Sequence, residues 1–157
     1  SYIYESAVSP HLAANIEGNP VTMEKIVNDY KRYCSKYDYV TVEGSGGIIC
    51  PIRYDGKEQI FLEDIIKKLK LSVLIVAGAG LGTINATVLT VKYLESQSIP
   101  IRGIIINRYH GGTMEDDNIK MIEAITHIPV ITRVNEGDCS INIEPHILKT
   151  LYTKDGK

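Results

Sequence analysis

The stretch from Leu71 to Ala77 constrains the fold of this chain more than any other, because it is apolar apart from Ser72. A strand with one face in water alternates apolar and polar residues, whereas an unbroken apolar run indicates a strand buried on both faces, as in parallel sheets. The glycine-rich residues 78–82 then break the strand, and a helix is expected to begin at Thr83 or Asn85. This order of strand, glycine turn and helix is typical of a parallel α/β fold.

The rest of the chain alternates in the same way. Strands are predicted at Tyr39–Val42, Ile101–Ile106 and Pro129–Ile131, with Ile48–Ile52 extending the sheet. Helices are predicted at Val21–Tyr37, Phe61–Leu69, Glu115–Ala124 and Pro145–Tyr152, and one more begins at Pro10. Ser9 and Thr22 are the predicted N-caps of the first two helices. Because strands separated by such helices imply right-handed crossovers, the predicted fold class is α/β, a parallel sheet with helices on both faces.

The size and charge of the chain narrow its function classes. Its 157 residues, 44% of them apolar, suffice for one core, so we expect a single domain over residues 1–157. Seventeen basic against nineteen acidic side chains give a net charge of −2, which provides no electrostatic footprint for nucleic acid or anionic membrane. The three cysteines lie far apart and form no CxxC pair, so neither disulfides nor zinc is indicated. We expect a soluble protein of the reducing cytoplasm, with no nucleic acid and no membrane as partner.

Glu43 is the first candidate for binding chemistry, because it follows the predicted strand Tyr39–Val42 and precedes several glycines. Ligands of parallel sheets bind beyond the carboxyl ends of the strands. A carboxylate there suits Mg²⁺, which keeps several waters and needs few protein oxygens beside substrate phosphates. Glycines such as Gly44 and Gly46 let backbone N–H groups approach an anion. A strand that simply ends in an acidic turn explains the same residues, and both interpretations stay open.

The segment Gly82-Thr83-Ile84-Asn85 is a second candidate, since the N-terminus of a helix offers free N–H groups and a positive dipole end to a carboxylate or phosphate. The glycines at positions 78, 80 and 82 do not match the dinucleotide fingerprint G-x-G-x-x-G. From the pattern alone, a tight turn capped by Thr83 or Asn85 is the favoured interpretation.

No catalytic constellation is apparent in the sequence. The four histidines have no H-E-x-x-H spacing and no obvious partner, so each is interpreted as structural or exposed: His11, His110, His127 and His146. The G-x-S-x-G motif of hydrolases does not occur either. We therefore assign no catalytic residue in this chain.

Five short motifs, taken together, resemble a known family. They are SPHLAA at 9–14, VEGSGG at 42–47, Pro51, GLGTIN at 80–85 and GIIINR at 103–108. In order and spacing they are similar to the dethiobiotin synthetases, over nearly the whole chain. That family uses ATP, CO₂ and 7,8-diaminononanoate to form the cyclic urea of dethiobiotin in biotin biosynthesis, with magnesium as its metal. The resemblance implies a ligase with a P-loop NTPase-like fold.

The resemblance also implies a nucleotide site assembled from several segments. Its expected ATP-binding residues are Glu43, Gly44, Ser45, Gly46, Asn107, Arg108, Val134, Asn135 and Glu136. Glu43 matches the magnesium-binding acidic residue, and Asn107 matches the asparagine that hydrogen-bonds the adenine ring. Ser45 replaces the alanine common in the family, and residues 134–136 depart from its usual Ile-Pro pattern.

A substrate site is implied in the same way. The residues that match the family's segments around 7,8-diaminononanoate are Ser9, Pro10, Gly82, Thr83 and Asn85. In the family, the helix start that corresponds to Gly82 and Thr83 receives the carboxylate of the substrate across a homodimer interface. The resemblance therefore implies a homodimer.

The phosphate-binding loop G-x-x-x-x-G-K-[ST] of the family has no counterpart in these 157 residues. In the family this loop, the first strand and two lysines of the active site lie upstream of the SPH segment. We therefore expect residues 1–157 to be an N-terminally incomplete synthetase-like domain that does not turn over ATP by itself, while the parent protein is the enzyme. Two alternatives stay open: another ATP-dependent amidoligase or partitioning-type ATPase, and a catalytically inactive binding or regulatory module of the same fold.

Overall fold

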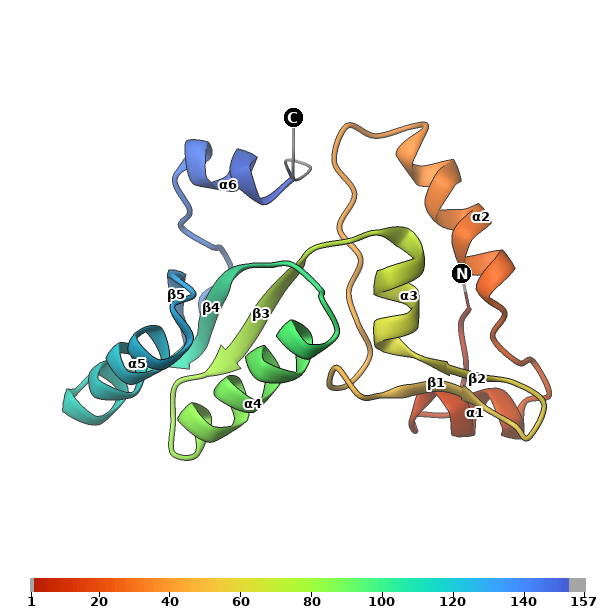
Figure 1. The fold of residues 1–157 in the computed structure, drawn as a ribbon, viewed down its shortest axis with the longest axis horizontal. Coiled ribbons are helices and arrows are strands. Elements are labelled where there is room, and N and C mark those ends of the chain that lie inside the picture. Colours follow the sequence, from red (N-terminus) through yellow and green to blue (C-terminus); the bar gives the residue numbers. More distant parts are fainter. Residues whose placement is uncertain (1, 153–157) are drawn as a thin grey trace. The chain divides into compact units, whose positions relative to one another are not determined.

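The computed structural model describes residues 2–152, which fall into two compact units on either side of the Leu71–Ser72 bond (Figure 1). The helices are α1 (Pro10–Ile16), α2 (Met23–Cys34), α3 (Leu62–Leu69), α4 (Thr83–Ser96), α5 (Thr113–Thr126) and α6 (Pro145–Leu151). The strands are β1 (Pro51–Tyr54), β2 (Gln59–Phe61), β3 (Val73–Gly78), β4 (Ile101–Tyr109) and β5 (Val130–Asn135). Among these residues no helix has both the length and the apolar character needed to cross a membrane. Compactness does not test independent folding, so the single domain over residues 1–157 stays a prediction.

The unit before residue 72 packs α1, α2 and α3 with a β-hairpin. β1 and β2 pair antiparallel around the turn that contains Asp55 and Gly56. Four buried side chains of this unit form one apolar cluster: Val21, Ile52, Ile60 and Ile65. The hairpin is therefore held by the same core as the helices.

The predicted starts of the first two helices are confirmed. Ser9 precedes α1, whose first turn contains Pro10, although the Ser9 side chain makes no capping hydrogen bond. Thr22 caps α2, because its Oγ1 accepts a hydrogen bond from the backbone N–H of Lys25 at 3.4 Å. α2 ends at Cys34, three residues before the predicted end.

Two strand predictions in this unit are wrong. Tyr39–Val42 is an irregular connection rather than a strand. Its residue types favour an extended backbone, but a strand also needs a paired neighbour, and no strand within residues 2–152 pairs with this segment. Ile48–Ile52 does not extend the main sheet, because its last residues belong to β1, which pairs with β2 in a separate two-stranded sheet.

The unit after residue 71 contains a parallel sheet in the order β3-β4-β5, flanked by helices, which confirms the predicted α/β fold class. Ile75 of β3 is paired with Ile104 of β4. In Figure 1, α4 and α5 run side by side, and they pack against each other. The large side chains that are fully buried in the described part of the chain all come from this unit: Val91, Leu94, Ile104, Ile106 and Ile122.

The strand predicted at Leu71–Ala77 is confirmed as β3, but its burial on both faces is not. Val76 keeps 63% of its surface exposed, because no described residue covers that side of the strand at this position. The strand predicted at Ile101–Ile106 is confirmed and continues to Tyr109. The helix predicted at Glu115–Ala124 is also confirmed, as the central part of α5.

Candidate functional site

The carboxyl ends of β3 and β4 meet at one edge of the sheet. Gly78, the last residue of β3, is paired with Asn107, and the N–H of Ala79 donates to the Asn107 carbonyl at 3.2 Å. At the end of β5, Asn135 is paired with Tyr109. The glycine-rich loop and Asn107 therefore adjoin at the edge where parallel sheets bind ligands.

The loop between β3 and α4 turns sharply at Gly82. Its φ of 84° lies in the left-handed region, which glycine adopts without steric cost. The prediction that Thr83 or Asn85 caps α4 is wrong, because Gly82 occupies the cap position and no side chain caps the helix. The Thr83 hydroxyl instead donates to the Gly78 carbonyl at 2.5 Å, and Thr83 is buried. This bond joins the first turn of α4 to the last residue of β3.

The same loop is held from α5 by Asn118. Its side-chain Nδ2 donates to the carbonyl oxygen of Ala79 at 3.0 Å and lies 3.4 Å from that of Gly80. Ala79 itself is buried, with 1% of its surface exposed. Two side chains from two helices, Thr83 and Asn118, therefore fix the backbone that leads into α4.

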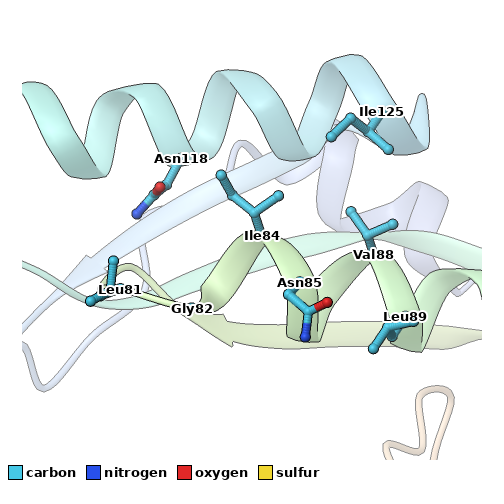
Figure 2. Close-up of a pocket in the computed structure, with 8 residues that line it drawn as sticks. All are labelled: Leu81, Gly82, Ile84, Asn85, Val88, Leu89, Asn118 and Ile125. Carbon is cyan, nitrogen blue, oxygen red and sulfur yellow. The ribbon is translucent and has the colours of Figure 1, made fainter.

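Two open grooves border the loop, and Leu81 and Gly82 line both. The first groove runs along the end of β3, and Arg108, His110 and Glu115 supply its charged side chains. The second lies between α4 and α5 and is mostly apolar (Figure 2). It is lined by Leu81, Gly82, Ile84, Asn85, Val88, Leu89, Asn118 and Ile125. The loop thus separates a charged groove from an apolar one.

Asn107 and Arg108 have a constrained geometry at the end of β4. The Asn107 Oδ1 accepts a hydrogen bond from the backbone N–H of Arg108 at 2.8 Å. Arg108 has a φ of 53°, which a residue with a side chain adopts only at a cost and which often marks a functional position. A Cβ added to Gly78 would stand 3.6 Å from the Arg108 guanidinium, so this cation lies across the end of β3. A positive charge beside the N-terminus of α4 suits an anionic ligand.

His110 joins three segments at the same edge. Its Nε2 lies 2.6 Å from Oε2 of Glu136, and its Nδ1 lies 3.4 Å from Oε1 of Glu115. The hydrogen bond to Glu136 is the main cause that raises the pKa of His110 above its usual 6.5, and Glu115 adds to it. Backbone N–H groups of His110 and Gly111 lower the pKa of Glu115. His110 is thus exposed, as interpreted from the sequence, but it has two carboxylate partners that the sequence does not reveal.

A second cluster lies beside it and joins the same three elements. The Tyr109 hydroxyl donates to Oδ1 of Asp116 at 2.6 Å, and Arg133 Nη1 lies 3.2 Å from both of these oxygens. The bond to Asp116 raises the pKa of Tyr109. The ends of β4 and β5 and the start of α5 are therefore connected by side chains as well as by the sheet.

The segment predicted beside the adenine lies at the end of β5. Val134 and Asn135 are its last residues, and Glu136 follows. The backbone N–H and the side-chain Nδ2 of Asn135 both donate to Oδ2 of Asp138, each at 2.9 Å. These two hydrogen bonds to one carboxylate fix the turn after the strand.

Glu43 and its glycines lie in the unit before residue 72. Within residues 2–152, no group pairs with the exposed Glu43 carboxylate, and no cluster of three metal-binding side chains occurs. A Cβ at Gly44 would stand 2.6 Å from Cδ2 of Leu62, so a larger residue here would require the Leu62 side chain to shift. One accessible carboxylate fits Mg²⁺, which is commonly held by one or two carboxylates together with substrate phosphates.

The predicted site residues thus fall into two groups. The structure brings together at the edge of one sheet the group Gly82, Thr83, Asn85, Asn107, Arg108, Val134, Asn135 and Glu136. The other group belongs to the unit before residue 72: Ser9, Pro10, Glu43, Gly44, Ser45 and Gly46. A common site for the two groups stays a prediction. Sequence reasoning missed Asn118 and Glu115. The one feature of the sequence that could have indicated them is their position on a helix that follows the end of a strand.

Comparison with known proteins places these residues in a family context. A family model described as an AAA domain matches residues 1–141. A relative from Brachyspira hyodysenteriae, named ATP-dependent dethiobiotin synthetase BioD, is 50% identical over 97% of this chain and 68% of its own length.

Two further relatives carry the same name. The protein of Clostridium botulinum is 49% identical over 97% of this chain and 66% of its own length. The protein of Clostridium kluyveri is 50% identical over 85% of this chain and 55% of its own length. The chain therefore spans between 55% and 68% of the length of these three relatives.

Proposed function

Since this chain belongs to the dethiobiotin synthetase family, we propose that the full-length protein is an ATP-dependent ligase that forms dethiobiotin. In this reaction one amine of 7,8-diaminononanoate takes up CO₂ as a carbamate, and ATP phosphorylates the carbamate. The second amine then displaces phosphate and closes the cyclic urea. The observation that carries the proposal is the identity of 50% over 97% of the chain, a range that includes the strand-end residues described above.

The nucleotide is proposed to bind where β4 and β5 end. The Asn107 Oδ1 already accepts one backbone hydrogen bond, which leaves its second lone pair and both Nδ2 hydrogens for an adenine ring. Residues 134–136 adjoin this position through the pairing of Tyr109 with Asn135. The Arg108 guanidinium offsets phosphate charge in the neighbouring groove.

The phosphates are proposed to meet the loop from Glu43 to Gly46. Bound Mg²⁺ would supply charge neutralisation at the β- and γ-phosphates, and Glu43 is the residue that would hold it. Gly44, Ser45 and Gly46 offer backbone N–H groups to the phosphate oxygens. Phosphoryl transfer of this kind depends mainly on positioning and on charge stabilisation, which these groups provide.

The diamine substrate is proposed to lie with its carboxylate at the N-terminus of α4. Gly82 and Thr83 place the positive dipole end of the helix there, and Asn85 adds a side-chain amide. Ser9 and Pro10 are proposed to flank the same pocket, on the basis of their match to the family segment.

A homodimer is proposed to form over the groove between α4 and α5. The exposed apolar side chains on these helices and the loop before α4 are Leu81, Leu89, Met114, Met121 and Ile125, and three of them, Leu81, Leu89 and Ile125, line the groove. Exposed apolar surface of this kind marks a protein interface. A second copy is the expected occupant, because the family binds its substrate carboxylate across a dimer interface at this helix.

The experiment that tests the function is an assay of the full-length protein for dethiobiotin by mass spectrometry. We expect product only when ATP, Mg²⁺, bicarbonate and 7,8-diaminononanoate are all present, together with one ADP per ring closed. ATP hydrolysis without dethiobiotin would favour another ATPase, and ATP binding without turnover would favour a regulatory module.

The free thiols of Cys34, Cys50 and Cys139 support a reducing compartment such as the cytoplasm, which cell fractionation would test.

A further inference from the structure

His110 and Glu136 form a side-chain connection immediately beyond the parallel ladder of β4 and β5. The last paired residues are Tyr109 and Asn135. His110 directly follows Tyr109, and Glu136 directly follows Asn135. The distance from His110 Nε2 to Glu136 Oε2 is 2.6 Å. The connection therefore continues the pairing of the two strands where their backbone hydrogen bonds end.

The other side of the imidazole ring faces a carboxylate that is fixed. Oε2 of Glu115 accepts backbone N–H bonds from His110 at 2.8 Å and from Gly111 at 3.0 Å, and its Oε1 lies 3.4 Å from the ring. The Glu115 side chain is 9% exposed, whereas that of Glu136 is 69% exposed. The ring thus links a held carboxylate at the start of α5 to a solvent-exposed one after β5.

Glu136 belongs to the segment that is proposed to contact the adenine ring. The turn after it is closed by the two bonds from Asn135 to Asp138. Within the described residues, His110 makes the one contact that ties Glu136 back to the end of β4, three residues from Asn107. The orientation of Glu136, which lies beyond the paired end of β5, therefore depends on the His110 ring.

We propose that His110 is a positioning residue for the nucleotide, which holds Glu136 at the end of β5 so that this segment and Asn107 contact one adenine ring. The inference rests on the proposed function, because it assigns a positioning residue to the same nucleotide site. Neither imidazole nitrogen needs to touch ATP, since the ring acts through Glu136.

The charge of the ring decides how many carboxylates it can bind. A protonated imidazole donates two hydrogen bonds, one to each of Glu115 and Glu136, and a neutral one donates a single bond. Glu136 first, and then Glu115, raises the pKa of His110 above 6.5. A group with a raised pKa in the folded state contributes its full stabilisation at low pH. It loses this stabilisation as the pH rises through that pKa. The next charged groups, Asp116 and Arg133, are paired with each other.

The test compares wild-type full-length protein with His110→Gln, Glu136→Gln and the control His146→Gln, an exposed histidine of α6. At a pH below the His110 pKa, measured by NMR of the ring, we expect KM for ATP to rise about two- to fivefold in the first two variants, as exposed ion pairs allow. KM for 7,8-diaminononanoate should stay unchanged, and the melting temperature should fall only slightly, as the loss of an exposed ion pair implies. The difference should shrink above the pKa, because a neutral ring keeps a single donor and the wild-type connection weakens there.

Equal pH profiles of KM for ATP in wild type and both variants would overturn the inference, as would an equal rise of both KM values. A wild-type protein that binds ATP but makes no dethiobiotin would instead overturn the proposed function. In that case the Kd for ATP and hydrogen exchange of residues 134–138 replace KM, with the same dependence on His110 expected. A wild-type protein without ATP binding would overturn both.

Discussion

The side chain of Asn118 donates a hydrogen bond to the carbonyl oxygen of Ala79, with 3.0 Å between Nδ2 and the oxygen. The two residues are 39 positions apart, and the bond joins α5 to the loop that leads into α4. Since Gly82 begins α4 without a capping side chain, the loop depends on such bonds for its conformation. The start of α4, where the substrate carboxylate is proposed to bind, is therefore oriented by a residue outside the loop.

Replacing Asn118 by leucine tests this relationship. Asn118→Leu keeps the size of the side chain but removes the donor, and we expect KM for 7,8-diaminononanoate to rise several-fold while KM for ATP stays unchanged. The free energy of unfolding should fall by about 1 kcal/mol, the usual contribution of one hydrogen bond. Asn28→Leu, on the exposed side of α2, is the matched control. Equal changes in both KM values would contradict a specific effect on the loop.

The buried hydroxyl of Thr83 gives a prediction about stability. Thr83→Val removes the bond to the Gly78 carbonyl and keeps the shape, so we expect the free energy of unfolding to fall by about 1–3 kcal/mol, because a partly buried acceptor is left unpaired. Thr90→Val is the control in the same helix, since its exposed hydroxyl bonds the Ala86 carbonyl and water can replace it. Chemical denaturation measures the free energy of unfolding of both variants. Equal losses for the two variants would contradict the special role of Thr83.

The hairpin turn gives a prediction about pH. Asp55 accepts hydrogen bonds from the backbone of Glu58 and Lys57 and from Arg53, and the Glu58 bond is the main cause that lowers the pKa of Asp55 below 3.8. A carboxylate with a lowered pKa stabilises the folded state at pH values above its unfolded pKa. This stabilisation is lost as the pH falls through the folded pKa.

We therefore expect Asp55→Asn to lower the melting temperature at neutral pH, and the difference from wild type to shrink as the solution is acidified below the unfolded pKa of Asp55. Asp38→Asn, an exposed residue in a connection, is the control. A difference that grows on acidification would contradict the assignment.

The sequence predicts the elements of this fold where the pattern is local. The apolar run before Gly78 and the helical pattern at Glu115–Ala124 depend only on neighbouring residues, and a strand and a helix form there. Tyr39–Val42 fails because its propensity is local but strand formation depends on a partner elsewhere in the chain. Gly82 is missed as the cap because its left-handed φ is a property of the fold, whereas a preference for threonine or asparagine is visible in the sequence.

The candidate site divides in the same way. Asn107 is found from the sequence because it belongs to GIIINR at 103–108, a local motif that carries the family resemblance. The partners of His110 cannot be found from the sequence, because Glu136 is 26 residues away and is brought to it by the register of β4 and β5. The φ of Arg108 is equally invisible in the sequence. Local patterns thus locate the edge of the sheet, and tertiary contacts determine how its side chains are held.

The exposed face of α4 and α5 predicts the oligomeric state. Leu89 is 60% exposed and lines the apolar groove in Figure 2, so Leu89→Asp would place a charge in the proposed dimer interface. We expect wild-type protein to sediment as a dimer and the variant as a monomer. Leu148→Asp, with 44% exposure on α6, is the matched control and should remain dimeric. A monomeric wild type, or dimers in both variants, would contradict this interface.

The final prediction concerns Glu43 and magnesium. Its carboxylate has no partner among the described residues, so Glu43→Gln should leave the melting temperature unchanged. If Glu43 holds Mg²⁺, the variant should need at least about tenfold more Mg²⁺ for half-maximal dethiobiotin formation, since even groups around a metal's ligands contribute ten- to a hundredfold. Glu5→Gln, an exposed residue, is the control. An unchanged Mg²⁺ requirement would mean that Glu43 only ends an irregular connection, and the metal ligand would have to be sought on another residue.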